Sequence, residues 1–273
     1  MTDQILFPAG TLGCAAGSPR DAVQTAAQYE VYYGKGHYDA RYPRPNPRLL
    51  RLVAKHLQPS GRLLDYGCGS GRYLLPLASG TSSAIGFDIS ATALATLRKR
   101  STEMGQTNVV QAIGPNLGDL DEHLEHTGLV DLAICLFGVL SHITDDAARH
   151  AALVRLRRAI DPGRGRVILS VPNKRRRFRN EQRDQTAVSS GRINYTRTLG
   201  ADRVDLGYRL YDTETLRSEL AEAGLEVEAF HAESCLPENI VASHPNLARL
   251  DGALSRLCPS SLGYGIVAVA RPA

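Results

Sequence analysis

The sequence contains no tryptophan, only two methionines, and no pair of cysteines in a C-x-x-C arrangement. A C-x-x-C pair is a common spacing for metal and redox sites, so we predict no metal centre. The five cysteines are an odd number, and free thiols in a reducing cytoplasm are the interpretation we favour. The longest apolar candidate, residues 129–140, is too short for a bilayer span and contains Asp131. The first residues lack the basic region of a secretory signal, so we expect a cytoplasmic protein without a membrane segment.

Positive charge is concentrated in one short run. Residues 174–183 hold six basic residues and one acidic residue, a balance of +5 in a chain whose net charge is +4, so the remainder sums to −1. The run has three interpretations: a solvated surface segment, recognition of a small anion by guanidinium groups such as that of Arg175, or contact with RNA. Because the remainder is slightly acidic, we rank RNA below the other two.

A glycine-rich stretch organises the rest of the sequence. In residues 62–72, apolar residues lead to Asp65, glycines follow at positions 67, 69 and 71, and an amphipathic segment begins. This pattern predicts a buried strand, a tight turn and a helix. Glycines in the turn permit positive φ and let a ligand approach the backbone.

The spacing of the glycines distinguishes a dinucleotide site from a site for a nucleoside that carries an amino group. A dinucleotide fingerprint reads G-x-G-x-x-G, whereas the third glycine here comes one residue early, at Gly71. A second short strand ends at Asp88, at the distance expected for an acid that binds ribose hydroxyls. Asp65, placed before the glycines, suits a ligand with an amino group better than a diphosphate.

With these motifs the chain resembles the class I S-adenosylmethionine-dependent methyltransferases. The resemblance rests on residues 64–71 and 86–90, with support from residues 136–142 and 156–165, and covers residues 46–172 well. It implies S-adenosylmethionine as the cofactor and a doubly wound, mostly parallel seven-stranded α/β sheet. The cofactor-binding residues that it implies are Asp65, Gly67, Cys68, Gly69, Gly71, Asp88, Ile89, Phe137 and Gly138.

The chain departs from the family after the third predicted strand. The family has an acid there that contacts the adenine amino group, but this chain has Gly114, Pro115 and Asn116, with Asp119 further along. The adenine contact is therefore left open, and backbone amides near Ile113 are one source.

The order of elements predicts a single methyltransferase domain over residues 46–273, preceded by an N-terminal arm and lid over residues 1–45. Two alternating segments, residues 192–198 and 203–211, flank a glycine-containing turn and predict a β-hairpin within an insertion at residues 172–211. We expect an irregular stretch up to residue 260 and a last strand, at the sheet edge, over residues 264–270.

Tyrosines gather before this domain. Five of the eleven tyrosines fall within residues 29–42, and the resemblance implies that this segment folds over the cofactor as a lid. Tyrosine rings stack on adenine or substrate and offer a hydroxyl; the alternative is that they only pack the arm onto the domain. The candidate substrate-binding residues are Tyr29, Tyr33, Tyr38, Tyr195, Tyr208 and Arg175.

Methyl transfer needs alignment and exclusion of water, and it needs a base only when the acceptor is protonated. His142, after the fourth predicted strand, is a candidate base, although packing in its loop is the interpretation we prefer; His37 is a second candidate. We expect a small-molecule acceptor. A tRNA wobble-uridine type methyltransferase and a non-catalytic protein that binds the cofactor for regulation are the alternatives, and a homodimer is a possible assembly.

Overall fold

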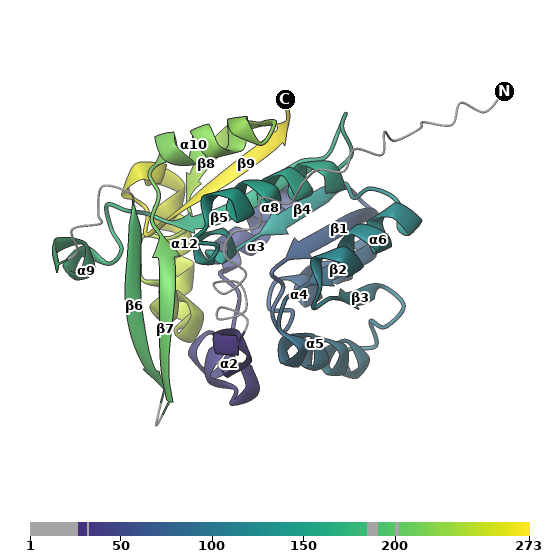
Figure 1. Cartoon of the computed structure of the whole chain (residues 1–273), viewed down its shortest axis with the longest axis horizontal. Helices are drawn as coiled ribbons and strands as arrows, with labels where there is room; N and C mark the ends of the chain where they lie inside the picture. Colours follow the sequence, from purple (N-terminus) through teal and green to yellow (C-terminus); the bar gives the residue numbers. More distant parts are fainter. Residues whose placement is uncertain (1–26, 32, 185–190, 200–201) are drawn as a thin grey trace.

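The computed structural model of the chain describes residues 27–31, 33–184, 191–199 and 202–273 (Figure 1). Of the predicted N-terminal arm and lid, residues 1–26, with the cysteine at position 14, and residue 32 lie outside the described residues. Residues 27–31 and 33–34 are helical, and α2 (His37–Arg41) follows them.

One seven-stranded sheet forms the centre of the molecule. Its strands stand in the order β3-β2-β1-β4-β5-β9-β8. The pairs from β3 to β5 are parallel, and β9 is antiparallel to both β5 and β8. The predicted doubly wound sheet is therefore confirmed. The strands are β1 (Gly61–Tyr66), β2 (Thr81–Phe87), β3 (Val110–Ile113), β4 (Leu132–Cys135), β5 (Arg166–Pro172), β8 (Leu225–Ala232) and β9 (Gly265–Pro272).

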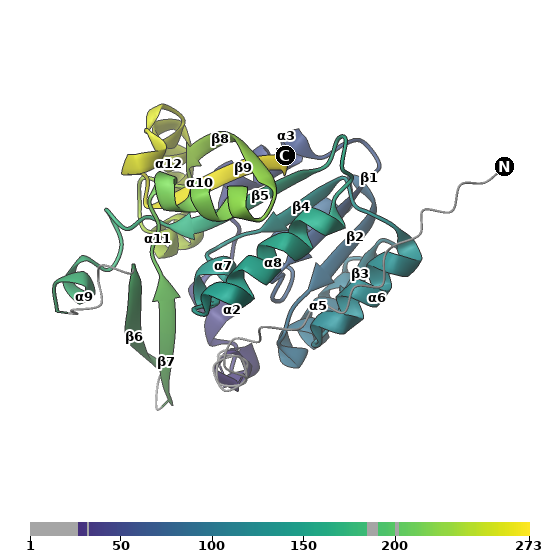
Figure 2. The same cartoon turned by 45° about the horizontal axis from the view of Figure 1, so that its top comes forward.

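Helices cover both faces of this sheet, as the apolar strands require. On one face the core joins the sheet to α6 (Leu117–Thr127), α8 (Asp146–Ala159) and α10 (Thr213–Glu222). On the other it joins the sheet to α3 (Pro47–His56), α4 (Leu74–Ala78) and α5 (Ala91–Glu103). Figure 2 shows α6, α8 and α10 in front of the strands.

Two expectations about the C-terminal part are wrong. The stretch expected to be irregular contains α11 (Glu238–Ser243) and α12 (Pro245–Leu257), followed by a short 3₁₀ helix, Ser260–Leu262. The last strand, β9, lies between β5 and β8 rather than at the edge. It is buried over Gly265–Ala270 because helices cover both of its faces.

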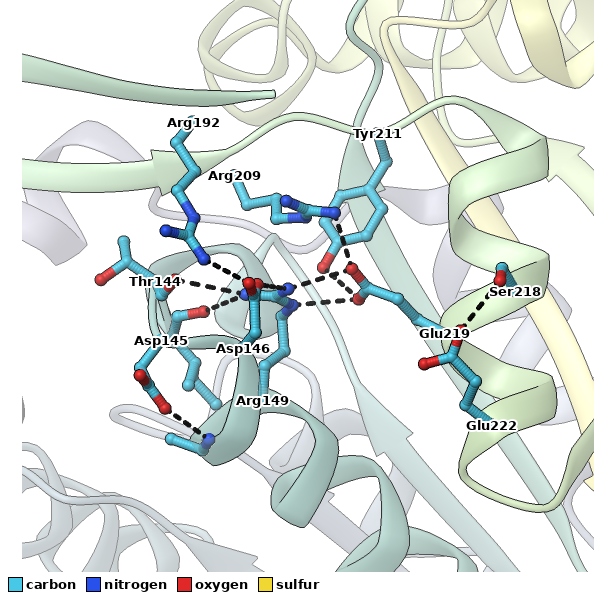
Figure 3. A network of polar contacts seen from close by, with 12 residues as sticks. Thr144, Asp145, Asp146, Arg149, Arg192, Arg209, Tyr211, Ser218, Glu219 and Glu222 are labelled. Atoms are coloured by element: carbon cyan, nitrogen blue, oxygen red, sulfur yellow. Dashed lines mark hydrogen bonds and ion pairs between the residues drawn. The ribbon is translucent and has the colours of Figure 1, made fainter. Parts of the chain in front are cut away.

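Where the sequence predicts a hairpin, β6 (Arg192–Leu199) and β7 (Asp202–Arg209) pair antiparallel as a separate two-stranded sheet. A partly buried ion-pair network at the base of this hairpin ties it to the domain (Figure 3). Arg149 of α8 donates two hydrogen bonds to Glu219 of α10, each 3.0 Å long. Arg209 pairs with the same carboxylate at 3.0 Å, and Tyr211 donates to it at 2.9 Å. The hairpin is thus held against the same end of the sheet as α2 (Figure 1).

Candidate active site

A cavity lies at the carboxyl ends of β1, β2 and β4, where open α/β sheets bind ligands. The space inside it is about 990 Å³, including its open mouth. We call it the aromatic cavity because half of its lining residues are tyrosines or phenylalanines. It is lined by Tyr29, Tyr33, Tyr38, Tyr42, Tyr66, Gly67, Phe87, Asp88, Ile89, Phe137, Val139, His142, Ile143, Arg177, Tyr195, Leu206, Tyr208 and Glu238.

The glycine turn after β1 borders this cavity. Gly67, Gly69 and Gly71 all have positive φ, at 84°, 54° and 87°. A Cβ atom at Gly67 would lie 2.5 Å from Cγ1 of Val139, so that close approach requires glycine. At Gly71 a Cβ would instead meet Leu97, so the third glycine serves the packing of α5.

Asp88 fixes the shape of this turn. Its carboxylate accepts hydrogen bonds from the backbone N–H of Gly69 at 2.8 Å and of Ser90 at 2.9 Å. Burial raises the pKa of Asp88, although these backbone hydrogen bonds oppose the shift. Since each carboxylate oxygen accepts more than one hydrogen bond, Asp88 retains acceptor capacity for ligand hydroxyls.

Asp65 is buried at the end of β1, behind the cavity wall rather than in its lining. Burial, together with the negative charge of Asp88, raises the pKa of this carboxyl to about 8, and Arg72 opposes the shift. A cationic ligand group nearby would stabilise its ionised form.

Phe137 and Arg72 form a pair beside the turn. Phe137 adopts a φ of 64°, a left-handed conformation that is unusual for a phenylalanine. Its ring lies 3.7 Å from the guanidinium carbon of Arg72. Arg72 donates from Nη2 to the Tyr38 hydroxyl at 3.2 Å, whereas its buried Nε atom has no hydrogen-bond partner among the described residues. Because this Nε–H donor has no partner among the described residues, the guanidinium is suited to an anionic ligand group.

The N-terminal segment closes one side of the cavity. The Tyr33 hydroxyl lies so close to Gly69 that a Cβ there would collide with it. Asp39 of α2 anchors the segment, since it accepts a hydrogen bond from Ser70 at 2.6 Å and pairs with Arg100 at 2.9 Å. The predicted lid tyrosines Tyr29, Tyr33 and Tyr38 are all in the lining.

His142 ends α7 (Val139–His142) and sits between two tyrosines. Its ring centroid is 4.5 Å from that of Tyr208 in β7 and 5.4 Å from that of Tyr29. Tyr208 also lies against Gly138, where a Cβ would collide with its hydroxyl. The hairpin and the N-terminal segment therefore meet at His142.

Several predicted residues lie elsewhere. His37 and Arg175 are not in the lining of the cavity, and Arg175 is exposed. Cys68 is buried beneath the turn, where burial raises the pKa of its thiol. Asp119 caps α6 by accepting a hydrogen bond from the backbone N–H of Asn116 at 3.1 Å.

Among the residues that the sequence interpretation did not assign to the site, three carry charge: Arg177 and Glu238 in the cavity lining, and Arg72 beside the glycine turn. Arg177 belongs to the basic run, but it is only 7% exposed and donates to Glu238 at 2.7 Å, so a wholly solvated run is wrong. Arg72 could have been recognised in the sequence, because it is a basic residue directly after the third glycine of the turn. Glu238 gave no signal, because its partner is 61 residues away in the chain.

Among the described residues, no group of His, Cys, Asp and Glu side chains could hold a metal ion. Across the same residues, no helix is both long and apolar enough to cross a membrane. The four cysteines that the structure describes are free.

Comparisons with known proteins agree with this geometry. A curated relative, dTDP-3-amino-3,6-dideoxy-alpha-D-glucopyranose N,N-dimethyltransferase of Streptomyces fradiae, is 29% identical over 133 residues. That match covers 46% of this chain and 44% of the relative, so it spans less than half of that protein.

Solved structures show the same fold. The CcbJ methyltransferase of Streptomyces caelestis superposes with a TM-score of 0.63 at 18% identity, over 92% of this chain and 98% of that one. A complex of DhpI with SAM and HEP gives a TM-score of 0.61 at 18% identity, over 94% and 100% of the two chains. The family model described as "Methyltransferase domain" matches residues 37–229. The chain therefore belongs to the methyltransferase domain family, of the class I type with a Rossmann-like sheet.

Proposed function

We propose that this protein is an S-adenosylmethionine-dependent methyltransferase whose acceptor is a small molecule. The observation that carries the proposal is the aromatic cavity, which has Gly67, Asp88 and Phe137 at the glycine turn and Tyr195 and Tyr208 on its hairpin side. One cavity thus joins a cofactor-type turn to a mostly aromatic pocket.

The described residues fit the cofactor. Asp88 has acceptor capacity for the ribose hydroxyls, and the positive φ of Gly67 and Gly69 shapes the turn beside it. The buried Nε atom of Arg72, which lacks a hydrogen-bond partner among the described residues, suits the carboxylate of the methionine part. Asp65 lies close enough to the turn to stabilise the amino group through its charge. When bound, the cofactor supplies an activated methyl group on a sulfonium.

The chain's own contribution is to align the acceptor and exclude water. Tyrosines from the N-terminal segment and from β6–β7 surround the acceptor end, and His142 stands between them. We assign His142 to holding the acceptor or accepting its proton, and we keep the N-terminal segment as a lid. The name of the Streptomyces fradiae relative states N,N-dimethylation of an amino sugar, which supports an amine as the accepting group here.

Transfer of a labelled methyl group tests the proposal. The purified chain is incubated with methyl-labelled S-adenosylmethionine and a cell extract separated into small-molecule, RNA and protein fractions. We expect label in the small-molecule fraction, with a loss of at least about tenfold when Asp88 is changed to Asn. Label in no fraction would contradict catalysis.

The alternatives give different results in the same assay. A tRNA methyltransferase would label the RNA fraction. A non-catalytic regulator would bind the cofactor and label nothing. A cytoplasmic location and a homodimer remain parts of the proposal, to be checked by fractionation and by light scattering.

A further inference from the structure

A second, more polar hollow adjoins the aromatic cavity, and we call it the arginine pocket. It is lined by Arg41, Tyr42, Arg176, Arg177, Phe178, Arg179, Asn180, Glu181, Glu238, Asn239 and Tyr264. Three of these residues, Tyr42, Arg177 and Glu238, also line the aromatic cavity. The two hollows therefore adjoin, with these three side chains between them. Figure 2 shows α9 (Arg179–Asp184) and α11, which contribute to the arginine pocket, at the same end of the molecule as the β6–β7 hairpin.

The lining of the arginine pocket has an excess of positive charge. Four arginines stand against two glutamates, which leaves a net charge of +2. Arginine stays protonated at any working pH. Glu238 is already paired with Arg177 at 2.7 Å, so within the lining only Glu181 balances the three remaining arginines. This excess matches a doubly charged anion better than a single carboxylate.

Two of these arginines are held in place by the fold. Arg176 donates from Nη1 to the carbonyl of Leu262 at 2.7 Å and from Nη2 to the carbonyl of Cys235 at 3.2 Å. Arg41 donates from Nε to the Tyr42 hydroxyl at 3.0 Å. Each guanidinium has five N–H donors, so both retain donors for a ligand. Holding them in advance lowers the entropic cost of binding.

The Arg177–Glu238 pair marks the junction of the two hollows. The Arg177 guanidinium carbon lies 4.9 Å from the ring centroid of Tyr264 on the side of the arginine pocket. It lies 5.8 Å from that of Tyr208, which lines the aromatic cavity. A single molecule that occupied both hollows would pass this pair.

We propose that the arginine pocket binds a phosphoryl group of the acceptor while the accepting group of the same molecule lies in the aromatic cavity. This inference rests on the proposed function and names its substrate class: a phosphorylated small molecule. A polynucleotide fits the charge distribution less well, since the chain outside residues 174–183 has a net charge of −1.

Binding can be measured without methyl transfer. The full chain, saturated with S-adenosylhomocysteine, is titrated calorimetrically with inorganic pyrophosphate, with acetate as the carboxylate probe and with bulk tRNA. The test variant is the double substitution Arg41→Gln with Arg179→Gln, both at exposed positions. The matched control is Arg183→Gln, which removes an exposed arginine from the same helix as Arg179 but outside both hollows.

We expect saturable pyrophosphate binding that the double variant weakens at least about tenfold, while the control changes it less than about twofold. Acetate should not compete at equal concentration. The inference is overturned if pyrophosphate does not bind, if the control loses as much affinity as the double variant, or if acetate or tRNA binds more tightly. Binding of S-adenosylhomocysteine, measured in the same samples, separates these failures from a failure of the proposed function.

Discussion

Changing Glu219 to Gln tests whether the network in Figure 3 anchors the hairpin. Glu219 accepts two hydrogen bonds from Arg149, whose side chain is only 3% exposed, and it also binds Arg209 and Tyr211. Glutamine keeps the shape but removes the charge, and its NH₂ group would oppose an arginine donor.

The magnitude follows from the burial of Arg149. Removing one partner of a buried ion pair costs roughly 3–5 kcal/mol, because the other charge is left without compensation. Arg149 keeps an ion pair with Asp146 and a hydrogen bond of 3.0 Å to the carbonyl of Ile143, which favours the lower value. A loss of about 3 kcal/mol corresponds to a Tm lower by about 6 °C, taking about 2 °C per kcal/mol for a chain of this size.

The assay is thermal unfolding of the parent chain and of Glu219→Gln, with Glu222→Gln as the control variant. Glu222 lies on the same helix, is exposed and accepts only a hydrogen bond of 3.0 Å from Ser218 among the interactions drawn in Figure 3. Its substitution should change stability by less than about 0.5 kcal/mol. A Tm for Glu219→Gln that matches the control would refute the reasoning.

Three further outcomes are expected at the site. The pKa of Asp65 is raised to about 8, and binding of a cation favours its ionised form. The affinity for S-adenosylmethionine should therefore rise with pH up to about 8 and level off above it. In calorimetry the Asp65→Asn variant should lack this pH dependence. Arg72→Met should keep the contact with Phe137 but raise the Kd for the cofactor roughly tenfold or more, as a charged hydrogen bond is lost; an unchanged Kd would remove Arg72 from the carboxylate site. In Gly67→Ala the new residue would have to adopt a φ of 84°, with its Cβ 2.5 Å from Val139. Urea unfolding should therefore show a free energy of unfolding lower by about 1–3 kcal/mol. Wild-type stability would show that the turn tolerates a side chain.

Local patterns predict the parallel half of this fold well. The glycine turn and Asp88 are contiguous motifs, and the strands before them are short apolar runs, so periodicity and turn chemistry suffice. Asp88, Tyr29, Tyr33 and Tyr38 line the cavity, and their roles in binding stay predictions.

The C-terminal part could not be predicted this way. In α12 the leucines at 247, 250, 254 and 257 are 40–88% exposed, while Ala248, Gly252 and Ser255 are buried. The apolar stripe of this helix therefore faces outward, opposite to the usual rule. The place of β9 depends on its pairing with β5 and β8, which are distant in sequence.

The surroundings of the basic run also could not be predicted from the sequence. Residues 174–183 look like a solvated segment, yet Arg177 is buried against Glu238, and the carbonyls of Leu262 and Cys235 hold Arg176. These partners come from the C-terminal segment, so only the tertiary structure separates the arginines that line a pocket from exposed Arg175.

Calorimetric titration of the purified chain with S-adenosylmethionine tests the central claim most directly. We predict saturable binding at one site, with an affinity roughly 10- to 150-fold lower for Asp88→Asn, since hydrogen bonds to a charged group contribute about 1.5–3 kcal/mol. Absence of binding to the parent chain, or equal affinity of the folded variant, would contradict the account.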